Sequence, residues 1–211
     1  MQGPSFELYT DSSPNGFKIT IALEELGLPY RLIHVNIDLG AHKQADFLAL
    51  NPAGRIPVLV DRQAGIVLFE SAAILLYLAQ YSGQLLEQAA QPRWMAITWL
   101  MHHSASMGPL LGQRVHFDCF EAIPNPAAQK RYRTLTEDAF ALLDQQLATR
   151  AWLAGESYSI ADIANFAWLH IAAIVGFDFS PYHHLNRWYR EVEKRPSVQR
   201  GIRLPAPAIG P

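Results

Sequence analysis

Ser13, Pro14 and Asn15 stand together between an apolar run and a stretch with helical spacing. Serine followed by proline is typical of a helix start, because the hydroxyl caps free N–H groups and proline fits the first helical position. Capping alone explains the pattern. The same polar groups, together with the helix dipole, could also hold an anion such as a thiolate.

A thiolate is energetically acceptable at such a corner. Lowering the pKa of a thiol from about 8.5 to about 6.5 requires roughly 2.7 kcal/mol of preference for the charged form. Two charge-assisted hydrogen bonds, each worth about 1.5–3 kcal/mol, supply that preference after desolvation is subtracted. Most of the thiol would then be ionised at neutral pH.

A proline interrupts the strand-like run R-I-P-V-L-V-D at Pro57. Proline cannot donate a hydrogen bond to a sheet, so one interpretation is an ordinary edge strand. The other is a cis bond between Ile56 and Pro57. That bond would turn the N–H and C=O of Ile56 outward, where an extended, peptide-like ligand could pair with them.

Glu70 and Ser71 come directly before the apolar helical run A-A-I-L-L-Y-L-A. Either side chain could simply cap that helix. Alternatively, Glu70 could bind an ammonium group while Ser71 and the neighbouring N–H groups bind a carboxylate. Together these two charges describe the α-amino acid end of a ligand.

The first eighty residues contain the elements that would position these groups. Strand and helix patterns alternate there, and a strand–helix–strand order implies a parallel pair of strands joined by a crossover helix. The run R-Q-A-G predicts the turn of an antiparallel hairpin. The predicted elements are a strand at 5–10, a helix from Phe17 to a stop at Gly27, a strand at 30–37, a helical turn at 46–50, hairpin strands at 55–61 and 66–71, and a helix from Ser71 to Tyr81 ending at Gly83.

The pattern changes after about residue 91. Four long segments show apolar residues at three- and four-residue spacing, and no strand pattern interrupts them. The boundary between an α/β domain and an all-helical domain is therefore expected near L-L-E-Q-A-A-Q-P. The tail L-P-A-P-A-I-G-P is expected to lie extended on the surface, because its prolines disfavour a helix.

Composition limits the possible partners and locations. Of the 211 residues, 50% are apolar and 17% are charged, and the net charge is −2. Without a block of like charge, neither nucleic acid nor an anionic membrane is an expected partner. The longest apolar run is too short to span a bilayer, and the start resembles no secretory signal. The lone cysteine, Cys119, cannot form an intrachain disulfide, which favours a reducing cytoplasm.

The order and spacing of these three motifs resemble the glutathione site of the glutathione transferase superfamily. Within it, S-P-N-G-F-K-I, L-F-E-S-A-A-I-L-L-Y-L-A and M-G-P-L-L-G-Q-R-V-H-F are most similar to the Nu class of glutathione-dependent disulfide-bond reductases. The resemblance implies a thioredoxin-like glutathione-binding domain at residues 1–84. It also implies an all-α domain at 91–211 that carries a second-substrate pocket and the contacts of a homodimer.

The resemblance also implies a role for each candidate residue. Ser13 and Asn15 would face the sulfur. The backbone of Ile56 would pair with the cysteinyl unit, and Glu70 and Ser71 would hold the γ-glutamyl end. Arg55 and His42 would lie near the glycine carboxylate, and Arg131 would reach glutathione in the partner subunit. For Arg131 a solvated helix face, shared with Lys130 and Arg133, is the alternative.

Other polar residues compete for a role or fit a structural one. Tyr9 and Ser12 are rivals of Ser13 for the sulfur. Ser159 and Asp162 predict a capping box, which serves stability. The histidine pairs lack metal-ligand partners at suitable spacing, so no metal is expected. Cys119 is far in sequence from the first helix, so the reactive thiol would come from the ligand.

The expected activity is therefore reduction of disulfides by glutathione, with reduction of organic hydroperoxides as a possible addition. A first alternative is conjugation of glutathione to electrophiles in a pocket formed by five residues of the helical domain, which could equally be core. These are Trp99, His103, Met107, Leu111 and Phe117. A second alternative is a non-catalytic regulatory or binding protein that shares the fold.

Overall fold

The computed structural model describes residues 5–205, and the chain divides into two compact units. One unit contains the residues up to Gln84 together with those from Arg195 onward, and the other contains Leu85–Lys194. The resemblance implies a single all-α domain over 91–211. The segment after Arg195 belongs instead with the first unit because its helix, α9 (Pro196–Gly201), packs against α1 (Pro14–Leu26).

The first unit is built on a four-stranded sheet in the order β2-β1-β3-β4. β1 (Phe6–Thr10) pairs in parallel with β2 (Tyr30–His34) and antiparallel with β3 (Val58–Asp61), which pairs antiparallel with β4 (Ile66–Phe69). The predicted parallel pair and hairpin are both confirmed. β3 is an interior strand and is buried along its whole length, so the edge-strand interpretation of Pro57 is wrong.

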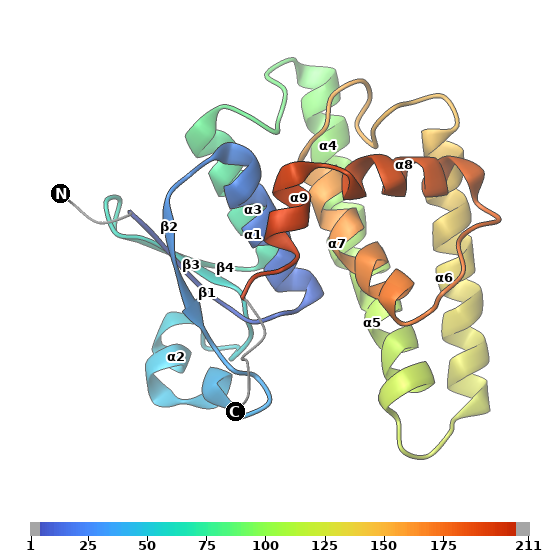
Figure 1. Cartoon of the computed structure of the whole chain (residues 1–211), viewed down its shortest axis with the longest axis horizontal. Coiled ribbons are helices and arrows are strands. Elements are labelled where there is room, and N and C mark those ends of the chain that lie inside the picture. Colours follow the sequence, from blue (N-terminus) through green and yellow to red (C-terminus); the bar gives the residue numbers. More distant parts are fainter. Residues whose placement is uncertain (1–4, 206–211) are drawn as a thin grey trace. The chain divides into compact units, whose positions relative to one another are not determined.

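Helices cover both faces of this sheet (Figure 1). α1 packs against α3 (Ser71–Ser82) on one face, where the Phe6 ring meets that of Tyr81 at 5.0 Å. On the other face Phe47, from α2 (Ala45–Leu50), packs with Val58 and Val60. Gly27 and Gly83 end α1 and α3 in the left-handed conformation, so both predicted helix stops are confirmed.

The second unit is helical, as the spacing of its apolar residues predicts. Its α-helices within the described chain are α4 (Ala90–His102), α5 (Gly108–Val115), α6 (Pro126–Leu147), α7 (Ile160–Ile174) and α8 (His183–Glu193). Two π-helical turns, η2 (His103–Met107) and η3 (His116–Phe120), flank α5. None of the described helices is long and apolar enough to cross a membrane.

The predicted capping box at the start of α7 is confirmed and is more extensive than predicted. Asp162 accepts hydrogen bonds from Ser159 N and from the backbone of Leu153, and Trp188 Nε1 donates to it at 2.8 Å. Burial raises the pKa of Asp162, although these donors oppose that change. The carboxylate therefore joins the start of α7 to α8 inside the second unit.

Candidate functional site

Ser13 occupies the position just before α1, and its backbone is extended there. Gly16 N donates to Ser13 Oγ at 3.1 Å, so the predicted cap is confirmed. Because a hydroxyl also carries its own hydrogen, Ser13 Oγ can accept from Gly16 and still donate to a ligand. Capping and ligand binding are therefore compatible at this residue.

Gly16 allows the first turn of α1 to lie against the end of β1. A Cβ at this position would be 2.4 Å from both Asp11 O and Thr10 Oγ1. One of these contacts is with backbone, which cannot swing aside, so any larger residue would push the turn away. Glycine thus fixes where the polar groups of this helix start are placed.

The backbone of Glu70, directly before α3, has φ 68° and ψ 109°. This is left-handed geometry for a non-glycine residue, which costs about 1–3 kcal/mol and is commonly found at functional sites. No side chain caps α3, so the simple capping interpretation of Glu70 and Ser71 is wrong. Glu70 is exposed, whereas Ser71 is buried at the first position of the helix.

Lys18 joins the two helix starts. Its ammonium donates to Asn15 Oδ1 at 2.9 Å and to Ser71 Oγ at 3.1 Å, and only 3% of the residue is exposed. Burial lowers the pKa of Lys18 to about 7, while the nearby Glu70 carboxylate acts in the opposite direction. The structure thus brings the predicted residues Asn15 and Ser71 together through a cation.

Lys18 is a site residue that the sequence patterns do not indicate. The available signal was a lysine inside F-K-I-T-I-A-L, a run whose other members are buried in the structure. A lysine on such a face can extend its stem to the surface, which makes it an unremarkable feature in a sequence. Its three-residue spacing from Asn15 places both on one side of the helix.

Ile56 lies just outside the sheet. The pairing of β3 with both β1 and β4 begins at Val58, so Ile56 takes no part in the strand pairing of the sheet. The bond between Ile56 and Pro57 is cis, which was one of the two interpretations of this motif. Ile56 itself is partly buried against the hydrophobic cluster beneath α2.

His42 and Arg55 lie on neighbouring segments. His42 is in the short 3-10 helix η1 (Ala41–Lys43), and its backbone oxygen is 3.1 Å from the position that a Cβ on Gly54 would take. Lys43 Nζ donates to Gly54 O at 2.9 Å and holds the two segments together. The Arg55 side chain is exposed, and His42 Nδ1 is buried without a hydrogen-bond partner in the described chain.

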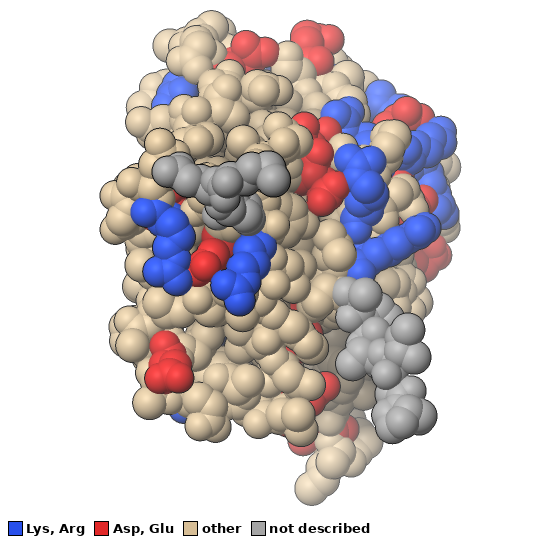
Figure 2. Space-filling model, turned by 60° about the vertical axis from the view of Figure 1, so that its left-hand side comes forward, with Lys and Arg blue, Asp and Glu red and all other residues tan. Residues whose placement is uncertain are grey.

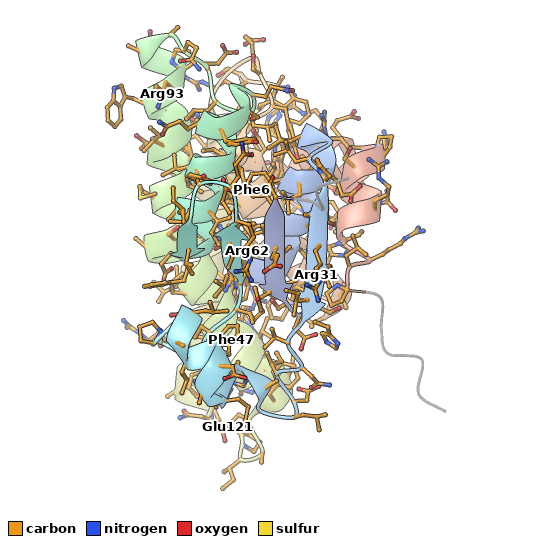
Figure 3. All side chains as sticks on the ribbon, turned by 90° about the vertical axis from the view of Figure 1, so that its left-hand side faces the viewer. Phe6, Arg31, Phe47, Arg62, Arg93 and Glu121 are labelled. Atoms are coloured by element: carbon orange, nitrogen blue, oxygen red, sulfur yellow. The ribbon has the colours of Figure 1, made fainter. Side chains whose placement is uncertain are left out.

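Tyr9 is directed to a different face of the sheet from α1. It packs in the cluster beneath α2, and its hydroxyl is 3.4 Å from Glu7 Oε2. Figure 3 looks onto this face, where Arg31 and Arg62 are labelled; both pair with Glu7. Burial raises the pKa of Tyr9, and the Glu7 carboxylate adds to this. Tyr9 is thereby separated from the start of α1.

Ser12 is also engaged elsewhere. Its hydroxyl donates to the backbone oxygen of Pro205 at 3.1 Å, within the first unit. A hydroxyl has a single hydrogen to donate, and that hydrogen is in use here. Of the two adjacent serines, Ser13 is the one whose hydroxyl hydrogen has no acceptor among residues 5–205.

The remaining predicted residues belong to the second unit. Arg131 is exposed on α6, beside the exposed Lys130 and Arg133, and forms no ion pair with the described residues. Met107 and Leu111 are fully buried and Trp99 and His103 nearly so, which makes these pocket candidates part of the helical core. The ring of Phe117 stacks on Tyr132.

The single thiol of the chain belongs to the second unit. Cys119 is exposed in η3 of the second unit. No cluster suited to a metal ion occurs among residues 5–205. Figure 2 shows acidic and basic side chains interspersed over a mostly uncharged face.

Comparison with known proteins identifies relatives over nearly the whole chain. Residues 4–80 match the model of the glutathione S-transferase N-terminal domain, and residues 94–196 match that of the C-terminal domain. The chain is 36% identical over 201 residues to the disulfide-bond oxidoreductase YfcG of Escherichia coli (strain K12), covering 93% of this chain and 94% of the relative.

Solved structures match equally well. A glutathione transferase from Burkholderia graminis, with two glutathione molecules bound per subunit, has a TM-score of 0.92, 34% identity and coverage of 97% and 90% of the two chains. A glutathione transferase from Pseudomonas putida, with one glutathione disulfide per subunit, has a TM-score of 0.89, 35% identity and coverage of 96% and 92%. The predicted fold, a thioredoxin-like domain followed by a helical one, is confirmed.

Proposed function

The chain belongs to the glutathione S-transferase family, and on that premise we propose that it is a glutathione-dependent disulfide-bond oxidoreductase of the Nu class. The observation that carries the proposal is a hydroxyl-and-carboxamide helix start in a chain whose single cysteine lies in the other unit. Such a site stabilises a thiolate that the protein does not itself supply, and glutathione supplies one.

The proposed roles follow the layout of the first unit. Ser13 and Asn15, with the N–H groups of α1, stabilise the sulfur of glutathione as a thiolate. Ile56 pairs with the cysteinyl unit, His42 and Arg55 lie near the glycine carboxylate, and Glu70 binds the γ-glutamyl ammonium. Ser71 and the first N–H groups of α3 bind the γ-glutamyl carboxylate.

The proposed reaction is two successive thiol–disulfide exchanges. The thiolate of glutathione attacks one sulfur of a disulfide, forms a mixed disulfide and expels the other sulfur as a thiolate, which takes a proton from solvent. A second glutathione thiolate then attacks the glutathione sulfur of the mixed disulfide. The products are oxidised glutathione and the second thiol, so the two electrons gained by the substrate come from two glutathiones.

Two features of the relatives favour disulfide exchange over conjugation. YfcG is named a disulfide-bond oxidoreductase, and the related structures hold two glutathiones or one glutathione disulfide per subunit. A site that accepts two tripeptide thiols suits a reaction that consumes two. A cytoplasmic homodimer, in which Arg131 reaches the partner's glutathione, completes the proposal.

One comparison tests this proposal. The same preparation is assayed with glutathione and bis(2-hydroxyethyl) disulfide, with cumene hydroperoxide, and with 1-chloro-2,4-dinitrobenzene. We expect the disulfide rate to dominate, with a smaller hydroperoxide rate. A dominant conjugation rate would replace the proposal with a conjugating transferase, and the absence of all three activities would favour a non-catalytic binding protein.

A further inference from the structure

Lys18 constrains how its two partners can be oriented. An ammonium group is a hydrogen-bond donor only, so each atom that it contacts must act as an acceptor. Asn15 therefore turns its carboxamide oxygen toward Lys18, and Ser71 turns an oxygen lone pair toward it. The other orientation of the carboxamide would set two groups of N–H donors against each other.

This constraint determines what the two side chains present on their other sides. The carboxamide nitrogen of Asn15, with its two hydrogens, points away from the ammonium. The hydroxyl hydrogen of Ser71 does the same. Both residues therefore present donors rather than acceptors, and one is at the start of α1 and the other at the start of α3. Donors are the groups that anions require.

We infer that Lys18 is a positioning residue for the reaction: by occupying the acceptor atoms of Asn15 and Ser71, it fixes both side chains as donors to the thiolate and the γ-glutamyl carboxylate of one glutathione. This inference rests on the proposed function. Lys18 itself touches neither the sulfur nor the disulfide. Its proposed task is to make the site selective for anions at both Asn15 and Ser71.

The charge of Lys18 is well placed for this role. Burial of the ammonium carries a cost that the nearby Glu70 carboxylate offsets only in part, and the pKa of Lys18 is about 7. The other acidic groups of α1, Glu24 and Glu25, are on its last turn and pair with Arg200 of α9 and with Arg195 directly before it. On the sheet, Glu7 lies on the α2 face with Arg62.

The γ-glutamyl carboxylate, bound at the buried Ser71 next to this ammonium, would stabilise the charged form of Lys18 by more than the γ-glutamyl ammonium at the exposed Glu70 opposes it, so ligand binding should be coupled to uptake of a proton by Lys18. Above neutral pH the free protein holds Lys18 mostly neutral, and the complex holds it charged. At a pH one unit above the free pKa, the expected uptake approaches about nine-tenths of a proton per site. A lysine that only filled space would not produce this uptake.

The first experiment is calorimetry with S-methylglutathione, which retains the γ-glutamyl carboxylate but has no ionisable thiol. Binding to wild-type protein at about pH 8 is measured in two buffers of different ionisation enthalpy, which gives the number of protons exchanged. We expect net uptake by wild type, none by Lys18→Met, and wild-type uptake by Lys194→Met, a control that removes an exposed lysine. Binding by wild type without uptake would overturn the inference.

The second experiment is a double-mutant cycle on the ionisation of bound glutathione. Lys18→Met and Asn15→Ala should each raise the apparent pKa of the bound thiol, by about one unit for a tenfold loss of thiolate preference. If Lys18 acts through Asn15, the double variant should be no worse than the single ones. Additive losses would overturn the inference. If Lys18→Met does not fold, Lys18→Gln replaces it, and the wild-type proton count still decides.

These outcomes separate the inference from the proposed function. If wild-type protein does not bind glutathione, the proposed function fails. If it binds and reduces disulfides but shows neither proton uptake nor coupling between Lys18 and Asn15, only the role of Lys18 fails.

Discussion

The ammonium nitrogen of Lys18 is 3.1 Å from the hydroxyl oxygen of Ser71, although the two residues are 53 positions apart in the chain. The contact joins the first turns of α1 and α3 on one face of the sheet. If the two helices separated, a buried ammonium would lose a partner, which is expensive away from water. The structure therefore holds the two proposed anion-binding ends at a fixed separation before any ligand arrives.

The buried lysine predicts an unusual dependence of stability on pH. Because burial lowers the pKa of Lys18 from 10.5 to about 7, the unfolded chain holds more protons than the folded chain between these values. Stability should therefore rise with pH through this window, by up to about 1.4 kcal/mol per pH unit from this residue. Urea denaturation of wild type and Lys18→Met at several pH values measures the difference. Parallel curves would show that Lys18 is not neutral above pH 7.

Two replacements of Glu70 should separate its contribution to glutathione affinity from the cost of its positive φ to stability. Both Glu70→Ala and Glu70→Gly should weaken glutathione binding by about tenfold or more, because each removes a charged hydrogen bond. Glycine accepts a positive φ and alanine does not, so Glu70→Gly should be the more stable variant by about 1 kcal/mol. Calorimetry and urea denaturation measure the two effects. Unchanged affinity in both variants would remove the γ-glutamyl assignment.

Ser13 and Asn15 should together determine the ionisation of the bound thiol. Ser13→Ala with Asn15→Ala should raise its apparent pKa, which ultraviolet titration of thiolate absorbance follows directly. Ser13→Thr is the matched control, because threonine keeps both the hydroxyl and the cap. An unchanged pKa in the double variant would assign thiolate stabilisation to the backbone N–H groups of α1 alone.

Arg131 tests whether two subunits share a site. If Arg131 reaches the partner's glutathione, Arg131→Ala should weaken binding several-fold while Lys130→Ala and Arg133→Ala do not, although all three are exposed on α6. Sedimentation of the variants establishes that the oligomeric state is unchanged. Equal affinities across the three variants and wild type would place Arg131 on a solvated helix face.

The Asp162 network should matter for stability and not for chemistry. Asp162→Ala would leave the donors of Leu153, Ser159 and Trp188 buried without their acceptor. Each unsatisfied buried donor costs about 1–3 kcal/mol, so a loss of several kcal/mol is expected. Glutathione affinity of the folded fraction should be unchanged, because this network is in the second unit. A thermal scan with calorimetric binding checks both statements.

The sequence predicted the order and type of the elements because each depends on local patterns. Alternating or helically spaced apolar residues, the Ser13–Pro14 start and the stops at Gly27 and Gly83 depend on few neighbours, and the structure contains them all. The boundary of the first unit could not be predicted from such local patterns. No helix is predicted over 196–201, and the single apolar residue of this short segment, Val198, does not show which unit the segment packs against.

The contacts that the sequence could not predict join residues distant along the chain. Lys18 with Ser71 and Asp162 with Trp188 are examples, because a lysine or an aspartate on a helix usually faces solvent. Capping of α3 by Glu70 or Ser71 is a reasonable local expectation, yet no side chain caps this helix, and Glu70 has a φ of 68° instead. The tail prediction falls mainly on residues 206–211, which lie outside the described chain.

The docking of α9 on α1 has a consequence for biosynthesis. Thr20 Oγ1 donates to Gly201 O at 2.8 Å, and a Cβ on Gly201 would come within 2.7 Å of Ile21, so the two helices are in close contact. A ribosome must therefore translate the entire second unit before the first can acquire this covering helix. Part of α1 in the nascent chain therefore stays uncovered until α9 leaves the ribosomal exit tunnel.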